Sequence, residues 1–200
     1  MRVLVACEFS GVVRDAFIAR GHTAWSCDLR PTESGDNHIT GDVLGVLAGK
    51  WDLMIAHPPC TYLSVSGLHW NKRRPERAAL TAQAYEFFMK LWNCDIPRIA
   101  IENPVGCMSR LFRKPDQIIQ PYEFGADASK KTCLWLKNLA PLKIDPGARK
   151  SGRMVNGRER WANQIDSGQN RLGPSADRAA LRAVTYPQIA AAMADQWGIL

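Results

Sequence analysis

The sequence predicts an α/β fold in which a mostly parallel sheet is flanked by helices. Short apolar runs at residues 2–7, 51–56 and 98–101 have the length and composition of buried strands. Between the last two runs, residues 76–92 carry apolar side chains at the spacing of one helical face. Alternation of strands and helices favours parallel strands, because each helix carries the chain back across the sheet.

The chain begins with a strand, a glycine turn and a helix. The apolar run at residues 2–7 leads to Gly11, and residues 12–20 then show helical spacing. A second strand is predicted at residues 23–27 and ends at Asp28. In sheets of this kind ligands bind beyond the carboxyl ends of the strands, where Asp28 is expected to lie.

The second half of the chain contains one more strand, a long irregular segment and a final helix. Residues 132–136 read as the strand, and residues 187–197 as a helix that opens with proline at its first position. Residues 140–174 are rich in Gly, Pro, Arg, Asn and Ser and show no periodicity, which indicates a long functional or mobile loop. We expect residues 1–200 to form a single domain with a basic loop at about 142–171.

Composition favours a cytoplasmic protein with a polyanionic partner. The chain has 200 residues and a formal net charge of +7, and surface Lys and Arg release counterions from phosphates. That signal is weak alone, because many basic proteins bind no nucleic acid. Six scattered cysteines without a C-x-x-C pair suggest reduced thiols and no metal site. No apolar run reaches membrane-spanning length, and Glu8 interrupts the N-terminal one, so we expect no membrane association.

The predicted strand at residues 51–56 runs into His57, Pro58, Pro59 and Cys60. Two prolines stiffen the backbone and end the ladder of strand hydrogen bonds, so Cys60 is held on a rigid turn at the carboxyl end of the strand. This placement suits a reactive thiol. The alternative is a small apolar filler, the commoner fate of cysteine.

The strand at residues 98–101 ends in Glu102, followed by Asn103 and Pro104. A glutamate at a strand end is usually a solvated or capping residue. Because the carboxyl ends of parallel strands meet at one edge of the sheet, we expect Glu102 to lie close to Cys60. A thiol and a carboxylate at one edge indicate a catalytic pair.

Pro58-Pro59-Cys60 and Glu102-Asn103-Pro104 together resemble the nucleophile and ENV-type motifs of the cytosine-C5 DNA methyltransferase family. Amino-directed methyltransferases carry Asp or Asn before the two prolines and an aromatic residue after them, where this chain has His57 and Cys60. The resemblance implies a Rossmann-like class I methyltransferase fold. It also implies that Cys60 adds to C6 of cytosine, that Glu102 holds N3, and that C5 receives a methyl group from S-adenosylmethionine.

The resemblance further implies a cofactor cleft at the first strand ends. There the family has a glycine-rich turn, an acid that binds ribose hydroxyls and a segment that holds adenine, and its last motif completes the wall. The assigned residues are Phe9, Ser10, Gly11, Asp28, Asp42, Val43, His57, Pro58 and Thr185. Taken by itself, Asp28 also fits the role of a helix or turn cap. Gly11 by itself needs only to form a tight turn. Val12 and Val13 stand where the family often has further glycines, which is a departure from its pattern.

Lys130 and Lys131 occupy the place of a family Arg-x-Arg motif that orients the cytosine and the catalytic residues. Lysine lacks the bidentate fork of arginine, so we assign one of the two a supporting catalytic role. An ordinary solvated charge at a strand start is the alternative.

The family's separate target-recognition domain is missing, and the shortness of the chain resembles compact phage or prophage versions. DNA is the expected partner, gripped beside the flipped base by the region after Cys60 and by the basic loop. Three alternatives stay open: an RNA substrate, a free cytosine nucleotide, and a nucleic-acid-binding relative without turnover. The candidate phosphate contacts, for which a solvated basic surface is the rival interpretation, are Lys72, Arg73, Arg74, Arg149, Lys150, Arg153, Arg158 and Arg160.

Overall fold

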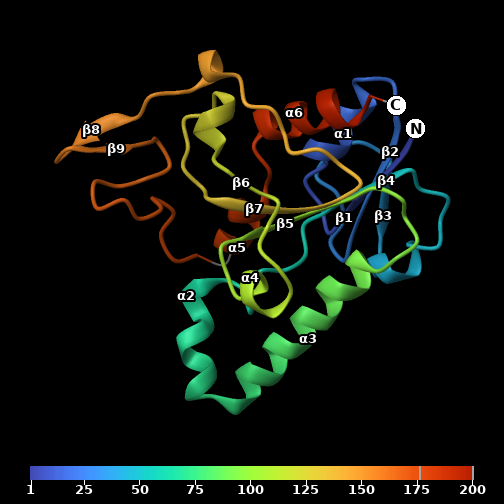
Figure 1. Cartoon of the computed structure of the whole chain (residues 1–200), viewed down its shortest axis with the longest axis horizontal. Coiled ribbons are helices and arrows are strands. Elements are labelled where there is room, and N and C mark those ends of the chain that lie inside the picture. Colours follow the sequence, from blue (N-terminus) through green and yellow to red (C-terminus); the bar gives the residue numbers. More distant parts are fainter. Residues whose placement is uncertain (176, 200) are drawn as a thin grey trace.

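The chain folds around a seven-stranded sheet with the strand order β3-β2-β1-β4-β5-β7-β6 (Figure 1). The computed structural model describes residues 1–175 and 177–199, without the side chains of Ser66, His69, Lys72 and Ala179. The strands are β1 (Arg2–Ala6), β2 (Thr23–Asp28), β3 (His38–Thr40), β4 (Leu53–Ala56), β5 (Ile99–Pro104), β6 (Gln117–Ile119) and β7 (Thr132–Lys137).

The helices are α1 (Val12–Ile18), α2 (Val65–Leu68), α3 (Pro75–Trp92), α4 (Met108–Leu111), α5 (Arg178–Ala183) and α6 (Pro187–Trp197). Short 3-10 turns lie at η1 (Val43–Gly45), η2 (His69–Lys72), η3 (Pro121–Phe124) and η4 (Pro146–Ala148). A separate hairpin consists of β8 (Arg153–Val155) and β9 (Arg158–Arg160). No helix in the described part of the chain is both long and apolar enough to span a membrane.

The sheet is mostly parallel and Rossmann-like, as predicted. Strands β3, β2, β1, β4 and β5 pair in parallel, and β7 pairs antiparallel with both β5 and β6. The chain builds outward from β1 in one direction through β2 and β3, and then in the other through β4 and β5. The order therefore reverses between β1 and β4, and such a switch point opens a crevice at the carboxyl ends of the strands.

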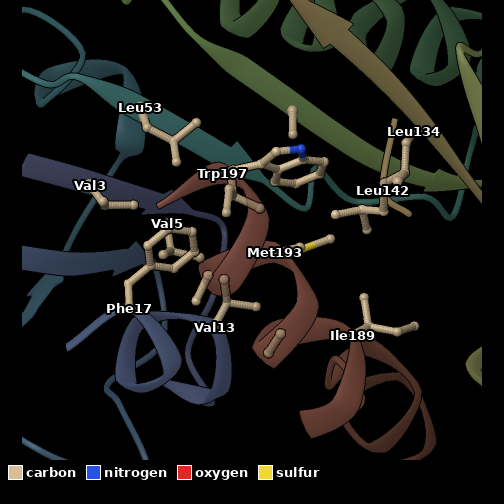
Figure 2. Packing of buried hydrophobic residues seen from close by; sticks show 14 of the residues in the cluster. Val3, Val5, Val13, Phe17, Leu53, Leu134, Leu142, Ile189, Met193 and Trp197 are labelled. Carbon is tan, nitrogen blue, oxygen red and sulfur yellow. The ribbon is translucent and has the colours of Figure 1, made fainter. Parts of the chain in front are cut away.

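Helices cover both faces of this sheet, and each face has its own core. On β1, Val3 and Val5 pack towards α1 and α6, whereas Leu4 and Ala6 pack towards α3, as the two-residue period of a strand requires. Figure 2 shows the first core, where Phe17 of α1 and Trp197 of α6 meet the sheet. Burial on both sides explains why β1 is a continuous apolar run rather than an alternating one.

Every strand and helix predicted from apolar patterning is confirmed, with ends shifted by a few residues. Strands β3 and β6 were not predicted, because three residues are too few to show a period. The segment at residues 140–174 was interpreted as irregular, but it contains η4 and the β8–β9 hairpin, which projects away from the sheet (Figure 1).

Candidate active site

Two side chains from neighbouring strand ends meet at the edge of the sheet. His57 directly follows β4, and its Nδ1 lies 2.9 Å from Oε2 of Glu102 on β5. Both point to the face that α6 covers, because His57 continues the alternation of Leu53 and Ile55, and Glu102 that of Ala100. The His57 and Glu102 side chains are 8% and 12% exposed, so water screens this contact poorly.

Asn103 joins the two motifs on the opposite face of β5. Its side-chain amide donates a hydrogen bond of 2.9 Å to the carbonyl of Pro58, and the residue is 1% exposed. A buried hydrogen bond of this kind fixes the two backbones relative to each other. Asn103 therefore holds the Pro58-Pro59-Cys60 turn against the strand that carries Glu102.

The segment after Cys60 also pairs with the segment after Glu102. The amide of Val65 donates to the carbonyl of Val105, and the amide of Cys107 donates to the carbonyl of Leu63. Gly106 permits this approach, since a Cβ at that position would lie 2.0 Å from the Leu63 carbonyl oxygen. The turn that carries Cys60 is thus anchored on both sides.

Helix α3 clamps the same segment from outside. Arg77 donates to the carbonyls of Thr61 and Gly67, and its guanidinium lies 4.9 Å from the centre of the Tyr62 ring. Thr81 donates to the carbonyl of Tyr62. The chain leaving Cys60 is therefore held by side chains of α3.

Glu102 is ionised in this environment. Burial favours the neutral acid, but the ammonium of Lys130, the hydrogen-bonded His57 and the hydroxyl of Thr132 outweigh it and lower the pKa of Glu102 to about 2. The carboxylate can then only accept hydrogen bonds, so His57 Nδ1 carries the hydrogen and donates it to Oε2.

Cys60 is a thiol, not a thiolate, at neutral pH. The residue is exposed, yet enough protein surrounds its sulfur for burial to raise the pKa, and the Glu102 carboxylate raises it further. Lys130 and Arg182 act in the opposite direction and lower the pKa of Cys60 less strongly. The thiolate fraction therefore grows as pH rises, and Glu102 and Lys130 both act on the Cys60 sulfur.

Lys130 and Lys131 have different surroundings. Lys130 is half-buried, and its positive charge lowers the pKa of both Glu102 and Cys60. Its Nζ donates a hydrogen bond to the carbonyl of Arg182. Lys131 is exposed, and its charge acts on Cys133. Lys130 also lines a narrow pocket at the start of α6, whose other lining residues are Glu102, Thr132, Thr185, Tyr186, Ile189 and Met193.

The carboxyl ends of β1 and β2 carry acidic groups. Burial together with the carboxylates of Asp28 and Asp42 raises the pKa of Cys7 to about 12, so both carboxylates lie near the end of β1. Oδ1 of Asp28 accepts from the amide of Arg30, and Oδ1 of Asp42 accepts from the amide of Leu44. The second carboxylate oxygen of each has no hydrogen bond within the described part of the chain.

Glu8 occupies the N-terminus of α1. Its carboxylate accepts hydrogen bonds of 2.7 Å from the amide of Val13 and 3.3 Å from the amide of Arg14, and Ser10 donates its hydroxyl to the same group. These amides would otherwise attract an anion, as they do in phosphate-binding Rossmann folds. The start of α1 is therefore unsuited to a pyrophosphate, because a carboxylate of the chain already satisfies its amides.

The remaining candidate cofactor residues come from the turn before α1 and from three other segments. Gly11 has φ of 76°, and a Cβ there would lie 2.3 Å from the buried guanidinium of Arg14, so the turn requires glycine. Phe9 is buried, and the guanidinium of Arg30 lies 4.0 Å from the centre of its ring. Pro58, Val43 and Thr185 are also buried.

Two solved structures show what this chain is similar to. One is assigned as a DNA modification methyltransferase encoded within a prophage of E. coli; it has 16% identity and a TM-score of 0.38 over 68% of this chain and 46% of that one. The other is the S. pombe Dnmt2 methyltransferase, with 18% identity and a TM-score of 0.42 over 70% of this chain and 50% of that one. The chain spans about half the length of each. No protein-family profile and no curated protein matches it.

The candidate phosphate contacts divide into two groups. Arg73 and Arg74 are exposed beside α3 and lie 5.8 and 5.0 Å from the centre of the Trp70 ring, whereas the side chain of Lys72 lies outside the described residues. In the basic loop, Lys150 and Arg158 are exposed. The other cations there bind the loop itself: Arg149 pairs with Glu159, Arg153 with Asp166, and Arg160 donates to the carbonyls of Asp166 and Glu159.

Sequence reasoning missed four residues that shape the site. The assignment of His57 to the cofactor stays a prediction, and the structure adds a contact with Glu102, for which the shared alternation of β4 and β5 was a signal. Asn103 stands next to Glu102, and its role in holding the Pro58 turn became visible only from its buried hydrogen bond. Thr132 and Glu8 gave no local signal, because their partners lie on other elements or across a turn.

Proposed function

We propose that this chain is an S-adenosylmethionine-dependent methyltransferase that transfers a methyl group to C5 of cytosine in DNA. Its intermediate is a covalent bond between Cys60 and C6 of the base. The observation that carries the proposal is the parallel pairing of β4 and β5, which places the Cys60 turn, just after β4, beside the part of β5 that carries Glu102. Asn103 ties the turn before Cys60 to β5, so the pair is preorganised.

Each residue of the pair has one task in this reaction. Cys60 loses its proton and adds to C6, which makes C5 nucleophilic. Glu102 takes up a proton from solvent as the base binds and donates it in a hydrogen bond to N3, where the addition places negative charge. The ammonium of Lys130 favours the Cys60 thiolate before it adds. The C5 proton then leaves, and the C6–S bond breaks as the ring double bond re-forms.

The acidic residues near the ends of β1 and β2 fit the proposed methyl donor. S-adenosylmethionine supplies, when bound, an electrophilic methyl group on a positively charged sulfur. Asp28 at the end of β2 offers a carboxylate oxygen to ribose hydroxyls, and Asp42 and Val43 flank the position assigned to adenine. Glu8 already satisfies the amides of α1, which disfavours a dinucleotide at the same place.

The decisive experiment traps the covalent intermediate. The full chain is incubated with S-adenosylmethionine and a duplex that contains 5-fluorocytosine, whose fluorine cannot leave as a proton does. A stable protein–DNA complex is expected with the native chain and none with Cys60→Ser. Absence of the complex with every duplex tried, and with 5-fluorocytosine in RNA and as a nucleotide, would refute the proposed chemistry.

The substrate class is resolved by methyl incorporation into DNA, RNA and free cytosine nucleotide. DNA is expected, with exposed Arg73, Arg74, Lys150 and Arg158 available for phosphates. Internal pairing of Arg149 and Arg153 reduces the free positive charge of the basic loop, which makes the comparison with a nucleotide informative. A preference for the nucleotide would replace DNA as the substrate and leave the roles of Cys60 and Glu102 unchanged.

A further inference from the structure

Arg14 on α1 is a charged side chain that is completely buried, with 0% exposure. Its Nη1 donates to the hydroxyls of Ser26 and Thr32 over 3.0 and 3.2 Å. Its Nη2 donates to the carbonyl and the hydroxyl of Ser34, and its Nε donates to a carboxylate oxygen of Asp15. A guanidinium removed from water needs this many partners, because each unpaired N–H group would be buried at a cost in free energy.

Two glycines leave the space that this guanidinium fills. Gly11 precedes α1, and Gly35 lies in the β2–β3 loop, which comprises residues 29–37. A Cβ at Gly11 would lie 2.3 Å from Nη2 of Arg14, and a Cβ at Gly35 would lie 3.0 Å from the same atom. The turn before α1 and the β2–β3 loop therefore both approach the guanidinium closely.

The β2–β3 loop is also bonded directly to the turn before α1. The amide of Glu33 donates to the carbonyl of Phe9 over 3.1 Å. The hydroxyl of Ser34 donates to the carbonyl of Ser10 over 3.2 Å and accepts from the buried guanidinium. The guanidinium and these two bonds hold the loop against residues that the sequence assigned to the cofactor.

Arg30 connects the same loop to Asp28 at the end of β2. Its amide donates to Oδ1 of Asp28 over 2.9 Å, and its guanidinium lies 4.0 Å from the centre of the Phe9 ring. Its carbonyl accepts from Nε2 of His38 over 2.9 Å, and Nδ1 of His38 lies 2.8 Å from the hydroxyl oxygen of Ser26. Because Ser26 also binds the buried guanidinium, one network of contacts runs from α1 to Asp28 and Phe9.

We infer that Arg14 is a positioning residue of the proposed S-adenosylmethionine site. It holds the β2–β3 loop against the turn before α1 and thereby fixes Asp28 relative to Phe9. The inference rests on the proposed function, because the ligand is the methyl donor named there. Arg14 is shielded from any ligand, so it acts by joining two walls of the site before the donor binds. An ordered site binds more tightly, since no binding free energy is consumed in ordering a loop.

Stability alone does not explain the burial of an arginine at this place. Replacement of a buried ion pair by apolar side chains of similar volume is often neutral or stabilising. A guanidinium carries five N–H groups in a planar fork, whereas the ammonium of lysine is a single nitrogen. The fork of Arg14 reaches the loop and β2 at the same time. Arginine is therefore suited to holding the loop in one geometry, which lysine cannot reproduce.

The test uses two variants that release the β2–β3 loop in different ways. Arg14→Lys keeps the positive charge and removes the fork. The double variant Thr32→Val/Ser34→Ala leaves Arg14 in place and removes two of its hydroxyl partners, so it tests the same contact if Arg14→Lys does not fold. Arg20→Met is the control, because Arg20 follows the same helix but pairs with the exposed Asp195.

Three quantities are measured on the full chain: the affinity for S-adenosylmethionine by calorimetry, amide hydrogen exchange of the β2–β3 loop, and urea unfolding. In both releasing variants the loop should exchange faster without ligand. The Kd for S-adenosylmethionine should rise about tenfold, which corresponds to ordering one or two side chains on binding. Trapping of the 5-fluorocytosine duplex should still reach the native rate at saturating S-adenosylmethionine. Arg20→Met should match the native chain in both affinity and exchange.

Native affinity in both releasing variants would overturn the inference, even with a lowered midpoint of urea unfolding, because Arg14 would then act on stability alone. Native exchange of the loop in both variants would overturn it as well, since Arg14 would not be what holds the loop. Both results would leave the proposed function intact. If the native chain itself does not bind S-adenosylmethionine, the proposed function and this inference fail together.

Discussion

At the scale of single residues, Lys130 is the charge that links the two reactive groups. Its ammonium lowers the pKa of Glu102 and of Cys60, whereas the carboxylate of Glu102 raises the pKa of Cys60. The sequence left Lys130 and Lys131 equivalent. Their separation follows from burial, because the half-buried Lys130 acts in a medium of lower dielectric than the exposed Lys131.

Removal of the Lys130 charge should make Cys60 less reactive. In Lys130→Met the pKa of Cys60 should rise further, so the thiolate fraction and the rate of iodoacetamide alkylation at pH 7 both fall. Glu102→Gln should have the opposite effect, because it removes a neighbouring negative charge. The rate is followed by mass spectrometry of the peptide that contains Cys60. Lys131→Met is the control, since its charge acts on Cys133, and equal effects of the two lysine variants would contradict the assignment.

At the scale of elements, the site depends on how closely two loops approach each other. The loops after β4 and β5 exchange backbone hydrogen bonds through residues 63, 65, 105 and 107. Among the described residues, the two segments share only an isolated antiparallel bridge, between Ser64 and Gly106, just before α2 begins, so no periodicity announces the pairing. Gly106 is the position where the approach is tightest.

Gly106→Ala should separate the loops and misplace Cys60. The new Cβ would lie 2.0 Å from the backbone oxygen of Leu63, which no side-chain rotation relieves. We expect trapping to slow by about 100-fold, the cost of misplacing a reacting group by roughly 1 Å. Stability should fall by about 1–3 kcal/mol, as in other overpacked sites.

The matched control is Gly173→Ala, where an added Cβ meets no atom within 4 Å. Rapid-quench trapping and urea unfolding measure the two effects separately. A Gly106→Ala protein with native trapping would show that the loop pairing does not position the nucleophile.

At the scale of the whole molecule, α6 brings the C-terminal part of the chain back onto β1 and α1. Trp197 packs with Phe17 of α1 and with β1, and its ring nitrogen donates to the carbonyl of Ala140 over 2.9 Å. The start of the same helix lies beside Glu102 and Thr185. One helix therefore closes a core and forms one wall of the site.

Trp197→Ala should destabilise the entire fold. The residue is 3% exposed, and truncation of a buried tryptophan to alanine costs about 3–5 kcal/mol. The measurement is the midpoint of urea unfolding followed by far-ultraviolet circular dichroism. Ile199→Ala, two residues further on and 76% exposed, should change stability by less than about 0.5 kcal/mol. A smaller loss for Trp197→Ala than for Ile199→Ala would contradict this packing.

Periodicity was sufficient for the main elements, because apolar spacing reports burial and burial on two faces is what a covered parallel sheet requires. The strand that leads to Cys60 and the strand that carries Glu102 were accordingly predicted. So was the expectation that their carboxyl ends lie at the same edge of the sheet. Strand β3 was too short to show a period, and the antiparallel direction of β7 beside β5 and β6 leaves no mark in apolar spacing, which reports burial and not strand direction.

The partners of the reactive groups followed from the fold alone. The sequence assigned His57 to the cofactor without a protein partner, and the pleats of β4 and β5 bring it to Glu102. The prediction that Arg149 and Arg153 contact phosphates is untested, and the structure adds that they pair with Glu159 and Asp166 inside the loop. Residue types reveal which chemistry a chain carries, whereas pKa values and contacts depend on distances between residues far apart in sequence, which only packing sets.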